Sequence, residues 1–343
     1  MPEAMNISEA LNTVINGWDL TQDEMVSVMT QIMDGKAESS QLGAFLTALR
    51  MKGEAVSEIA GAARVMKEKA VRLKVSVEPI VDTCGTGGDE ADTFNISTAA
   101  AFAVAGTGIV VAKHGNRAVS SRSGSADVLR TLGVNIEAEA GIVETCLQEV
   151  GIGFLFAPML HGAMRHAAAV RKELGFRTLF NLLGPLTNPA GAHAQVVGVY
   201  DRKRVHPIAS VLRDLGCLHA FVVHGEDGLD EITLTGKTDV CELIGGEIRE
   251  YTLDPVDLGL PLCTMEDLRG GTPEENARIL EGILNGDPGP CREIVVLNAA
   301  AAIVAAEKAP SLDEGLKLAR ESIDSGAARS KLEHLVRISQ GKS

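Results

Sequence analysis

The periodicity of apolar residues changes once along the chain, and this change constrains the fold more than any other feature. Up to about residue 72, apolar residues recur every three or four positions, as in amphipathic helices. After about residue 76, short apolar runs rich in Val, Ile and Phe alternate with helical segments. Such alternation is typical of a parallel sheet with both faces covered. We therefore expect an α/β fold in which a small N-terminal all-helical domain precedes a larger domain with a central, mostly parallel sheet.

The ends of the first helices are marked by residues that cap helices. Thr21 with Glu24 has the spacing of a capping box, and Ser57 is a candidate N-cap. Gly17, Gly35 and Gly53 close segments, because glycine readily adopts the left-handed conformation that ends a helix. The sequence predicts helical segments over residues 8–20, 21–35, 38–53 and 55–73.

Later apolar runs predict the strands of the sheet. The expected strands are residues 78–84, 108–114, 152–158, 195–201 and 219–225, and the segment 238–253 is expected to form a hairpin. Ligands of open parallel sheets bind beyond the carboxyl ends of the strands. We therefore expect the loops 82–97, 113–125 and 224–233 to meet on one rim. After the hairpin, residues 293–306 and 311–326 are predicted helices, but the last 90 residues carry no functional motif that we can interpret.

The composition excludes several classes of protein. The 343-residue chain has a net charge of −14, so it is a poor non-specific binder of nucleic acid or of an anionic membrane. The N-terminal residues lack the basic and apolar regions of a signal peptide, and the weakly polar run Ala99 to Ala112 is too short for a membrane helix. The six cysteines contain no CxxC motif and no zinc-type spacing. We expect reduced thiols and a cytoplasmic location.

A glycine-rich segment, DTCGTGGDEADTFNIST, spans residues 82–98 after the first expected strand. Its glycines allow backbone N–H groups to approach an anion, and it leads into a helix N-terminus, which also favours anions. Residue 90 is Glu, so the segment is not a dinucleotide-binding GxGxxG motif, and the chain has no Walker A loop. The alternative is a tight turn followed by a helix cap.

A second unusual segment, KHGNRAVSSRSGSADVL, spans residues 113–129. Lys113 and Arg117 can hold phosphate oxygens, and the serines can donate hydrogen bonds. Ser123 or Ser125 is a candidate N-cap for a helix that begins at Ala126. Cations on the same rim as a glycine loop favour a substrate with more than one phosphate group, whereas the alternative is a solvated polar loop.

Two further groups of residues are candidates for ligand binding. The adjacent acids Asp230 and Glu231 could hold Mg²⁺, which takes one or two carboxylates and completes its shell with water and phosphate. The alternative is that the two acids are an ordinary surface pair that binds no metal. The segment 161–191 is basic and could present an arginine to a carboxylate, although its histidines could be ordinary helix-surface residues. Its charged candidates are His161, Arg165, His166, Arg171 and Arg177.

Together these motifs resemble those of the anthranilate phosphoribosyltransferases of tryptophan biosynthesis. The resemblance rests on GTGGD, NIST, KHGNRAVSSRSGSADVL, LGFRTLFNLLGPLTNP and the later Asp-Glu pair, and it is dense from Asp82 to Pro189. It implies a Mg²⁺-dependent transferase that moves the phosphoribosyl group of phosphoribosyl pyrophosphate (PRPP) to the amine of anthranilate. It also implies a helical domain of residues 1–72, to which the segment of about 165–190 returns, hinged to an α/β domain of residues 76–343. The helical domains would form a homodimer.

The resemblance also assigns residues to binding sites, without a covalent nucleophile. Mg²⁺ would bind Ser97, Asp230 and Glu231. Anthranilate would contact Gly85, His114, Asn116, His161 and Arg171, with Arg171 nearest its carboxylate. PRPP would contact Gly85, Gly88, Asp89, Thr93, Asn95, Ile96, Ser97, Thr98, Lys113, His114, Gly115, Asn116, Arg117, Ala118, Val119, Ser120, Ser121 and Ser125.

Three other functions are weighed against this one. A pyrimidine nucleoside phosphorylase shares the architecture and the glycine and lysine loops, but it uses free phosphate and needs no Mg²⁺ pair. A non-catalytic relative that binds nucleic acid would be expected to carry a basic groove, which the net charge of −14 disfavours. An inactive structural relative would not need Asp230 and Glu231. The carboxylate pair and the KHGNR sequence favour the transferase.

Overall fold

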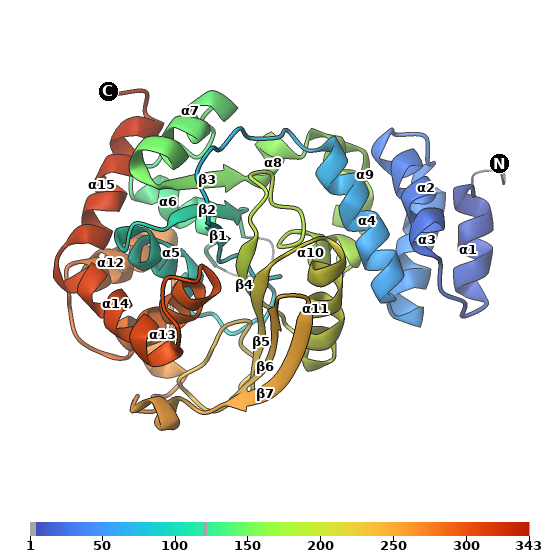
Figure 1. Ribbon diagram of the computed structural model, residues 1–343. Helices are drawn as coiled ribbons and strands as arrows, with labels where there is room; N and C mark the ends of the chain where they lie inside the picture. The colour runs from blue at the N-terminus through green and yellow to red at the C-terminus, as the bar shows by residue number, and fades with distance from the viewer. Residues whose placement is uncertain (1–4, 119–121, 343) are drawn as a thin grey trace.

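Four helices form a bundle at one end of the molecule, on the right in Figure 1. The computed structural model describes residues 5–118 and 122–342. The helices of the bundle are α1 (Ile7–Ile15), α2 (Gln22–Met33), α3 (Ser39–Lys52) and α4 (Val56–Lys69). They confirm the four helical segments expected from the sequence.

The helix ends predicted within the bundle are confirmed in all but one case. Thr21 and Glu24 form the expected capping box at the start of α2. Gly17, Gly35 and Gly53 have positive φ angles of 82°, 71° and 90°. The prediction of Ser57 as an N-cap is wrong, because α4 already begins at Val56. The Ser57 hydroxyl instead donates a 2.7 Å hydrogen bond to a carbonyl oxygen in the turn before α2.

A seven-stranded sheet follows the bundle, in the order β3-β2-β1-β4-β5-β6-β7 (Figure 1). Strands β1 to β5 are parallel, whereas β5, β6 and β7 pair in antiparallel fashion. All the predicted strands and the late hairpin are therefore confirmed. The strands are β1 (Ile80–Asp82), β2 (Val110–Gly115), β3 (Ile152–Phe156), β4 (Ala194–Gly198), β5 (His219–Gly225), β6 (Thr238–Ile244) and β7 (Glu247–Leu253).

Most of the remaining α-helices lie around this sheet. Two of them, α13 and α14, confirm the late helices that the sequence predicts, whereas α12 and α15 are not among the predicted elements. The helices are α5 (Ile96–Gly106), α6 (Ser125–Thr131), α7 (Ala140–Thr145), α8 (Ala157–Leu160), α9 (Arg165–Leu174), α10 (Leu179–Leu183), α11 (Val205–Asp214), α12 (Pro273–Leu284), α13 (Pro290–Ala305), α14 (Leu312–Asp324) and α15 (Ala327–Ser339).

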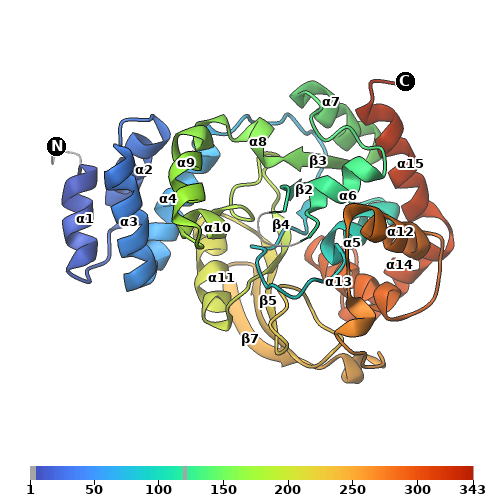
Figure 2. The same ribbon diagram turned by 180° about the vertical axis from the view of Figure 1, so that it is seen from behind.

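Helices cover both faces of the sheet, as expected for buried parallel strands. On one face α5 and α13 pack against the parallel strands, and α14 and α15 lie outside them (Figure 2). On the other face α11 packs against β5 and β6 and also contacts α4. Apolar residues of α4, α11 and the sheet belong to one continuous core cluster, which includes Ala63, Ala209 and Val222. The bundle is therefore joined to the sheet by apolar packing.

The bundle also contacts a segment that lies much later in the chain. Helix α9 packs against α2 and α3, and Figures 1 and 2 both show it beside the bundle. Two buried side chains of α9, Ala167 and Val170, belong to the same core cluster as the bundle residues.

Among the described residues, no helix is long and apolar enough to cross a bilayer.

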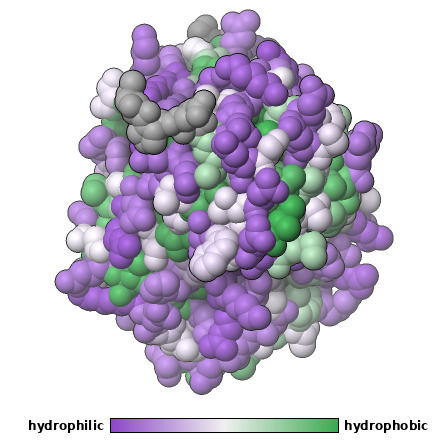
Figure 3. All heavy atoms as spheres, turned by 90° about the vertical axis from the view of Figure 1, so that its right-hand side faces the viewer, coloured by the Kyte–Doolittle hydropathy of each residue, from purple (hydrophilic) through white to green (hydrophobic). Residues whose placement is uncertain are grey.

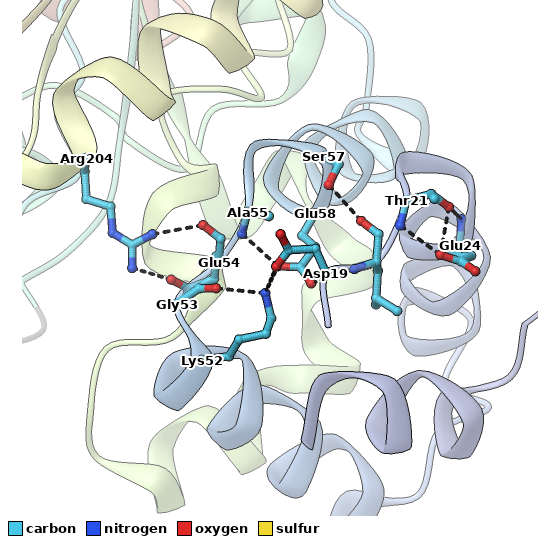
Figure 4. Close-up of polar contacts among 11 residues, drawn as sticks. Asp19, Thr21, Glu24, Lys52, Gly53, Glu54, Ala55, Ser57, Glu58 and Arg204 are labelled. Carbon is cyan, nitrogen blue, oxygen red and sulfur yellow. Dashed lines mark hydrogen bonds and ion pairs between the residues drawn. The ribbon is translucent and has the colours of Figure 1, made fainter. Parts of the chain in front are cut away.

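A buried ionic network organises the turn between α3 and α4 (Figure 4). The carboxylate of Glu58 is fully buried and accepts hydrogen bonds from Lys52 Nζ at 3.0 Å and from the backbone of Leu20 and Ala55. The neighbouring Glu54 forms a buried ion pair with Arg204, which directly precedes α11. This network therefore links the bundle to the α/β part of the chain.

Replacing Glu58 with Ala should destabilise the protein strongly. The Lys52 side chain, which is 8% exposed, would lose a buried partner, and two backbone N–H groups would lose their acceptor. Breaking a buried pair from one side typically costs about 3 kcal/mol or more. We expect a loss of that size in the free energy of unfolding, measured by urea denaturation and circular dichroism.

The control for this variant is Arg64→Ala, which removes an ion pair with Glu68 whose side chains are 55% and 53% exposed. Exposed pairs of this kind change stability by only about 0.5 kcal/mol. Equal effects of the two substitutions would contradict the role given to Glu58.

Candidate active site

The glycine loop after β1 lies directly against the loop after β5. The backbone N–H of Gly87 donates to Asp230 Oδ2 at 2.7 Å, and the N–H of Thr86 donates to the Gly198 carbonyl oxygen at 2.8 Å. Gly87 and Gly88 have positive φ angles of 66° and 84°, a conformation that favours glycine. The backbone of this loop therefore makes direct contacts with both β4 and Asp230.

Glycines are required where these segments meet. A Cβ atom on Gly198 would lie 1.5 Å from the carbonyl oxygen of Asp230, so no side chain fits there. A Cβ atom on Gly85 would lie 2.8 Å from Asp230 Oδ2. The end of β4 must therefore be glycine for the 224–233 loop to close over it.

Glu231, Ser97 and Lys113 join the same rim. The N–H of Ser97, in the first turn of α5, donates to Glu231 Oε1 at 3.2 Å. The buried Lys113 Nζ donates to Ser97 Oγ at 3.2 Å and to the carbonyl oxygen of Thr83 at 2.9 Å. Of the three residues that the sequence proposes as metal ligands, Glu231 thus contacts Ser97 at the N-terminus of α5, and Asp230 contacts the glycine loop that precedes this helix.

Three acids approach one another at this point. Burial and the charges of Asp89 and Glu231 hold the pKa of Asp230 well above its ordinary value. Burial raises the pKa of Glu231 to about 7, with a further contribution from Asp89, although Lys113 acts in the opposite direction. Carboxylates with raised pKa values in a shared site indicate a deficit of positive charge. A site that is built from oxygen donors and lacks positive charge suits a divalent cation of the Mg²⁺ type.

A second polar cluster lies beneath the rim, around His114. The buried Asp82 accepts hydrogen bonds from the His114 backbone N–H at 3.1 Å and from Asn188 Nδ2 at 2.7 Å. Burial raises the pKa of Asp82 to about 6. The His114 ring lies 5.1 Å from that of His161, measured between centroids.

Both of these histidines are held in the neutral form. Burial lowers the pKa of His114 to about 3 and that of His161 to about 4. His114 Nδ1 lies 2.9 Å from the carbonyl oxygen of Gly184, so Nδ1 carries the proton and Nε2 is a free acceptor. Among the described residues, His114 Nε2 and both ring nitrogens of His161 have no hydrogen-bond partner. These nitrogens are available to a ligand.

The loop after β2 is organised by its one acid. Asp127 Oδ2 accepts from the backbone N–H groups of Ala118 at 3.1 Å and Gly124 at 3.0 Å. The prediction of Ser123 or Ser125 as the N-cap is wrong, because α6 begins at Ser125 and its N-cap is Gly124. The Ser125 hydroxyl donates instead to the carbonyl oxygen of Asn116 at 3.3 Å. Gly124 is needed because a Cβ atom there would lie 2.3 Å from the Ala118 nitrogen.

Asn95 joins this loop to the glycine loop. Its Nδ2 donates to the carbonyl oxygen of Ser123 at 3.1 Å, and its Oδ1 accepts from Asn276 Nδ2 at 3.0 Å. With the contacts of Gly87 and Ser97 to Asp230 and Glu231, this hydrogen bond confirms that the three loops share one rim. Arg117, by contrast, forms an exposed ion pair with Glu137 at 2.8 Å.

The other predicted site residues differ in their surroundings. Ile96 and Thr98 are buried, and the Ile96 side chain belongs to the core. Thr93 forms an isolated antiparallel bridge with Arg269. Arg171, in the last turn of α9, places its guanidinium 5.2 Å from the ring centroid of Phe180. Gly115 packs against Ser125 and Phe154, and Val119, Ser120 and Ser121 lie outside the described residues.

Two further residues shape the rim: Asn298, for which the sequence predicts no role, and Arg177, which the sequence proposes only as a candidate partner of a ligand carboxylate. Asn298, in the middle of α13, accepts from the Ile232 N–H and donates to the Ile232 carbonyl, both at 2.9 Å, and so positions the residue after Glu231. Arg177 donates to the Gly88 carbonyl and to Glu90, and its guanidinium lies 4.4 Å from the Tyr200 ring centroid. An isolated Asn in an alanine-rich helix is the signal that could have identified Asn298, because buried amides need partners.

Comparison with known proteins assigns the family. Residues 8–70 match the helical bundle domain of a glycosyl transferase family, and residues 77–329 match its a/b domain. An anthranilate phosphoribosyltransferase of Anaeromyxobacter sp. (strain K) is 58% identical over 330 residues, which cover 96% of this chain and 98% of the relative. The chain belongs to the anthranilate phosphoribosyltransferase family.

Further members of the anthranilate phosphoribosyltransferase family agree in length and fold. The enzyme of Symbiobacterium thermophilum is 55% identical, and the match covers 95% of each chain. The crystal structure of the Thermus thermophilus enzyme superimposes with a TM-score of 0.92 at 47% identity, covering 96% of this chain and 99% of that one. The predicted fold class, a helical domain with a larger α/β domain around a mostly parallel sheet, is thereby confirmed.

Replacing Glu231 with Gln should stabilise the metal-free protein at alkaline pH. An acid whose pKa rises from 4.5 to about 7 on folding binds more protons in the folded state, so its contribution to stability falls as the pH rises between these values. At about pH 8 we expect the variant to be more stable by roughly 1–3 kcal/mol. The difference should vanish below pH 4.5, where Glu231 is protonated in both states. Chemical denaturation at several pH values without divalent ions measures this, and a pH-independent difference would contradict it.

Proposed function

We propose that this chain transfers the phosphoribosyl group of PRPP to the amine of anthranilate, giving phosphoribosyl-anthranilate and pyrophosphate in tryptophan biosynthesis. The observation that carries this function is 58% identity to an anthranilate phosphoribosyltransferase over 96% of the chain. The related enzyme of Saccharomyces cerevisiae, 28% identical with a TM-score of 0.86, is described in complex with PRPP and Mg. The same yeast enzyme is also described in complex with 4-fluoroanthranilate. A biosynthetic role also supports the predicted cytoplasmic location.

The rim supports the PRPP site that the sequence predicts. The glycine loop presents backbone N–H groups, and α5 presents its N-terminus with Ser97 and Thr98 in its first turn. Lys113 adds a buried positive charge beside Ser97. Helix N-termini and glycine loops bind anions because their N–H groups lack internal partners. These groups can hold the phosphates of PRPP.

Asp230 and Glu231, with the Ser97 hydroxyl, are the residues that would hold Mg²⁺. Their fit to this ion rests on three converging carboxylates, those of Asp89, Asp230 and Glu231. Burial, with the negative charge of Asp89 nearby, raises the pKa of Asp230 and Glu231. When bound, Mg²⁺ would neutralise negative charge that develops on the leaving pyrophosphate. Lys113 can stabilise the same charge directly.

The neutral histidines support an anthranilate site beneath the rim. His114 Nε2 is a hydrogen-bond acceptor without a partner among the described residues, and His161 lies beside it. Neutral imidazoles can line the path of an aromatic amine and accept a hydrogen bond from it. Arg171 can pair with the anthranilate carboxylate, as its guanidinium is planar and suits bidentate contacts. Burial lowers the pKa of Arg171 without removing its charge at neutral pH.

The reaction needs orientation and charge stabilisation more than covalent chemistry. The anthranilate nitrogen attacks C1 of the ribose while the bond from C1 to the pyrophosphate oxygen breaks, and the amine then loses a proton. A transition state of oxocarbenium character forms as negative charge grows on pyrophosphate. Holding two substrates in line contributes several kcal/mol to such a reaction, typically about 7–11 kcal/mol at most. No serine of the rim is needed as a nucleophile.

The alternatives raised by the sequence find less support. The relatives at 55–58% identity are all named anthranilate phosphoribosyltransferases, which does not favour a pyrimidine nucleoside phosphorylase. The acidic net charge of −14 still disfavours a nucleic-acid-binding role.

The proposed function includes two hinged domains and a homodimer. The division into residues 1–72 and 76–343, with 165–190 returning to the first domain, is supported by the packing of α9 on α2 and α3. Dimer formation through the bundle is supported by Ile15, Trp18 and Met51, which are 64%, 70% and 83% exposed at that end. Figure 3 shows hydrophobic atoms among polar ones on this side of the molecule. Exposed apolar groups of this size favour protein contacts.

A coupled assay tests the reaction. The purified protein should consume anthranilate, followed by its fluorescence, and release an equal amount of pyrophosphate only when PRPP and Mg²⁺ are both present. The double substitution of Asp230 and Glu231 by Asn and Gln should abolish turnover or raise the Mg²⁺ concentration that turnover requires. Turnover of uridine or thymidine with phosphate, and none of anthranilate, would support the phosphorylase instead.

Replacing Arg171 with Ala should weaken the use of anthranilate more than that of PRPP. Loss of a charged hydrogen bond to the carboxylate should raise the KM for anthranilate by about tenfold or more. The KM for PRPP should remain nearly unchanged. Arg165→Ala is the matched control, because Arg165 is an exposed residue in the first turn of the same helix. An equal rise in the KM values for both substrates would contradict the proposed role of Arg171.

A further inference from the structure

A second group of metal-ligating side chains lies away from the rim, between α11 and the β6–β7 hairpin. Cys241 of β6 and Glu250 of β7 are directly paired across the antiparallel ladder, so their side chains point to the same face of the sheet. His206 is the second residue of α11, which packs against β6 and β7 on that face. The fold thus brings together an imidazole, a thiol and a carboxylate from three elements.

The distances within this group are short enough for a common ligand. One ligand atom of each of His206, Cys241 and Glu250 lies within 4.8 Å of the other two. His206 Nδ1 lies 2.7 Å from Glu250 Oε1. The Cys241 side chain is buried. Only small side-chain movements are needed to place the three atoms around one ion.

The surroundings of the group allow a cation to enter. His206 and Glu250 are exposed and line a surface pocket of about 300 Å³ with Cys241 at its base. Asp239 lies in the same pocket and pairs with Arg202 at 2.7 Å. Burial and the charges of Glu250 and Asp239 raise the pKa of Cys241 to about 12. The thiol is therefore protonated at neutral pH, and a metal ion that binds it would displace this proton.

We propose that His206, Cys241 and Glu250 form a binding site for a borderline-soft divalent cation of the Zn²⁺ class. Nitrogen, sulfur and oxygen donors together suit Zn²⁺, whereas Mg²⁺ requires oxygen donors. Three protein ligands leave a fourth tetrahedral position for water from the open pocket. The donor set therefore distinguishes this site from the carboxylates of the rim.

An ion at this site would connect α11 to the hairpin. Arg204, directly before α11, pairs with Glu54 at the turn between α3 and α4, and α11 packs against α4. The ion would therefore stabilise the contact between the hairpin at the edge of the sheet and the helix that carries the bundle. Because an ion that binds only the folded state raises its stability, occupancy should raise the temperature of unfolding.

Co²⁺ is a suitable probe, because its bond to a thiolate absorbs in the near ultraviolet. We would titrate the reduced, metal-free full chain with Co²⁺ in the presence of excess Mg²⁺, which occupies oxygen-donor sites. One equivalent of Co²⁺ should produce a thiolate band, and added Zn²⁺ should abolish it. Cys241→Ser should remove the band, and His206→Gln should weaken Co²⁺ binding by about tenfold or more.

Cys84→Ser is the necessary comparison, because Asp82, Cys84 and His114 form another group whose ligand atoms lie within 4.8 Å. The proposal predicts that the band survives in this variant. Loss of the band in Cys84→Ser, with its retention in Cys241→Ser, would overturn the proposal, as would the absence of any thiolate band in the parent protein.

A second measurement covers the case in which Cys241→Ser does not fold. Zn²⁺ should raise the unfolding temperature of the parent and of His334→Gln, a control at an exposed histidine of α15. It should raise that of His206→Gln and Glu250→Gln much less, and both of these residues are exposed, so their variants should fold. Equal shifts in all four proteins would also overturn the proposal.

Discussion

The contact between Gly198 and the main chain of Asp230 is the constraint on which the candidate active site depends. A Cβ atom at residue 198 would lie 1.5 Å from the Asp230 carbonyl oxygen, so only glycine permits this approach. The loop after β5 can therefore lie across the end of β4. Asp230 then reaches the Gly87 N–H, and Glu231 reaches the Ser97 N–H at the start of α5. Backbone packing thus determines where the carboxylates stand.

The same packing places like charges close together in a buried site. Asp230 and Glu231 have raised pKa values because of burial and because Asp89 stands beside them. Such an arrangement disfavours the metal-free, fully ionised protein and favours the protein that has bound a cation. The rim is therefore organised for a charged ligand at some expense of stability. Beneath it, burial keeps His114 and His161 neutral.

Sequence patterns were sufficient for the strands, for most of the helices and for the main motifs, but not for α12 and α15. The strands were predictable because runs such as those at 108–114 and 219–225 are mostly buried and have continuous apolar centres. The metal candidates were predictable because Asp230 and Glu231 are adjacent and chemically distinctive. Ser57 and Ser123 were misassigned because a capping residue is recognised by its backbone conformation, and several nearby residues could have provided it.

The sequence by itself determined the order of helices and strands, the parallel sheet and the loops that carry the site, since these depend on local periodicity and composition. Only the tertiary structure decided which distant residues support those loops. Asn298 holds the residue after Glu231, Asn276 holds Asn95, and Arg177 holds Gly88, across 66, 181 and 89 positions of the chain. The physical reason is that a hydrogen bond between distant segments depends on how those segments pack. The local sequence around one partner does not indicate which distant residue the other partner is.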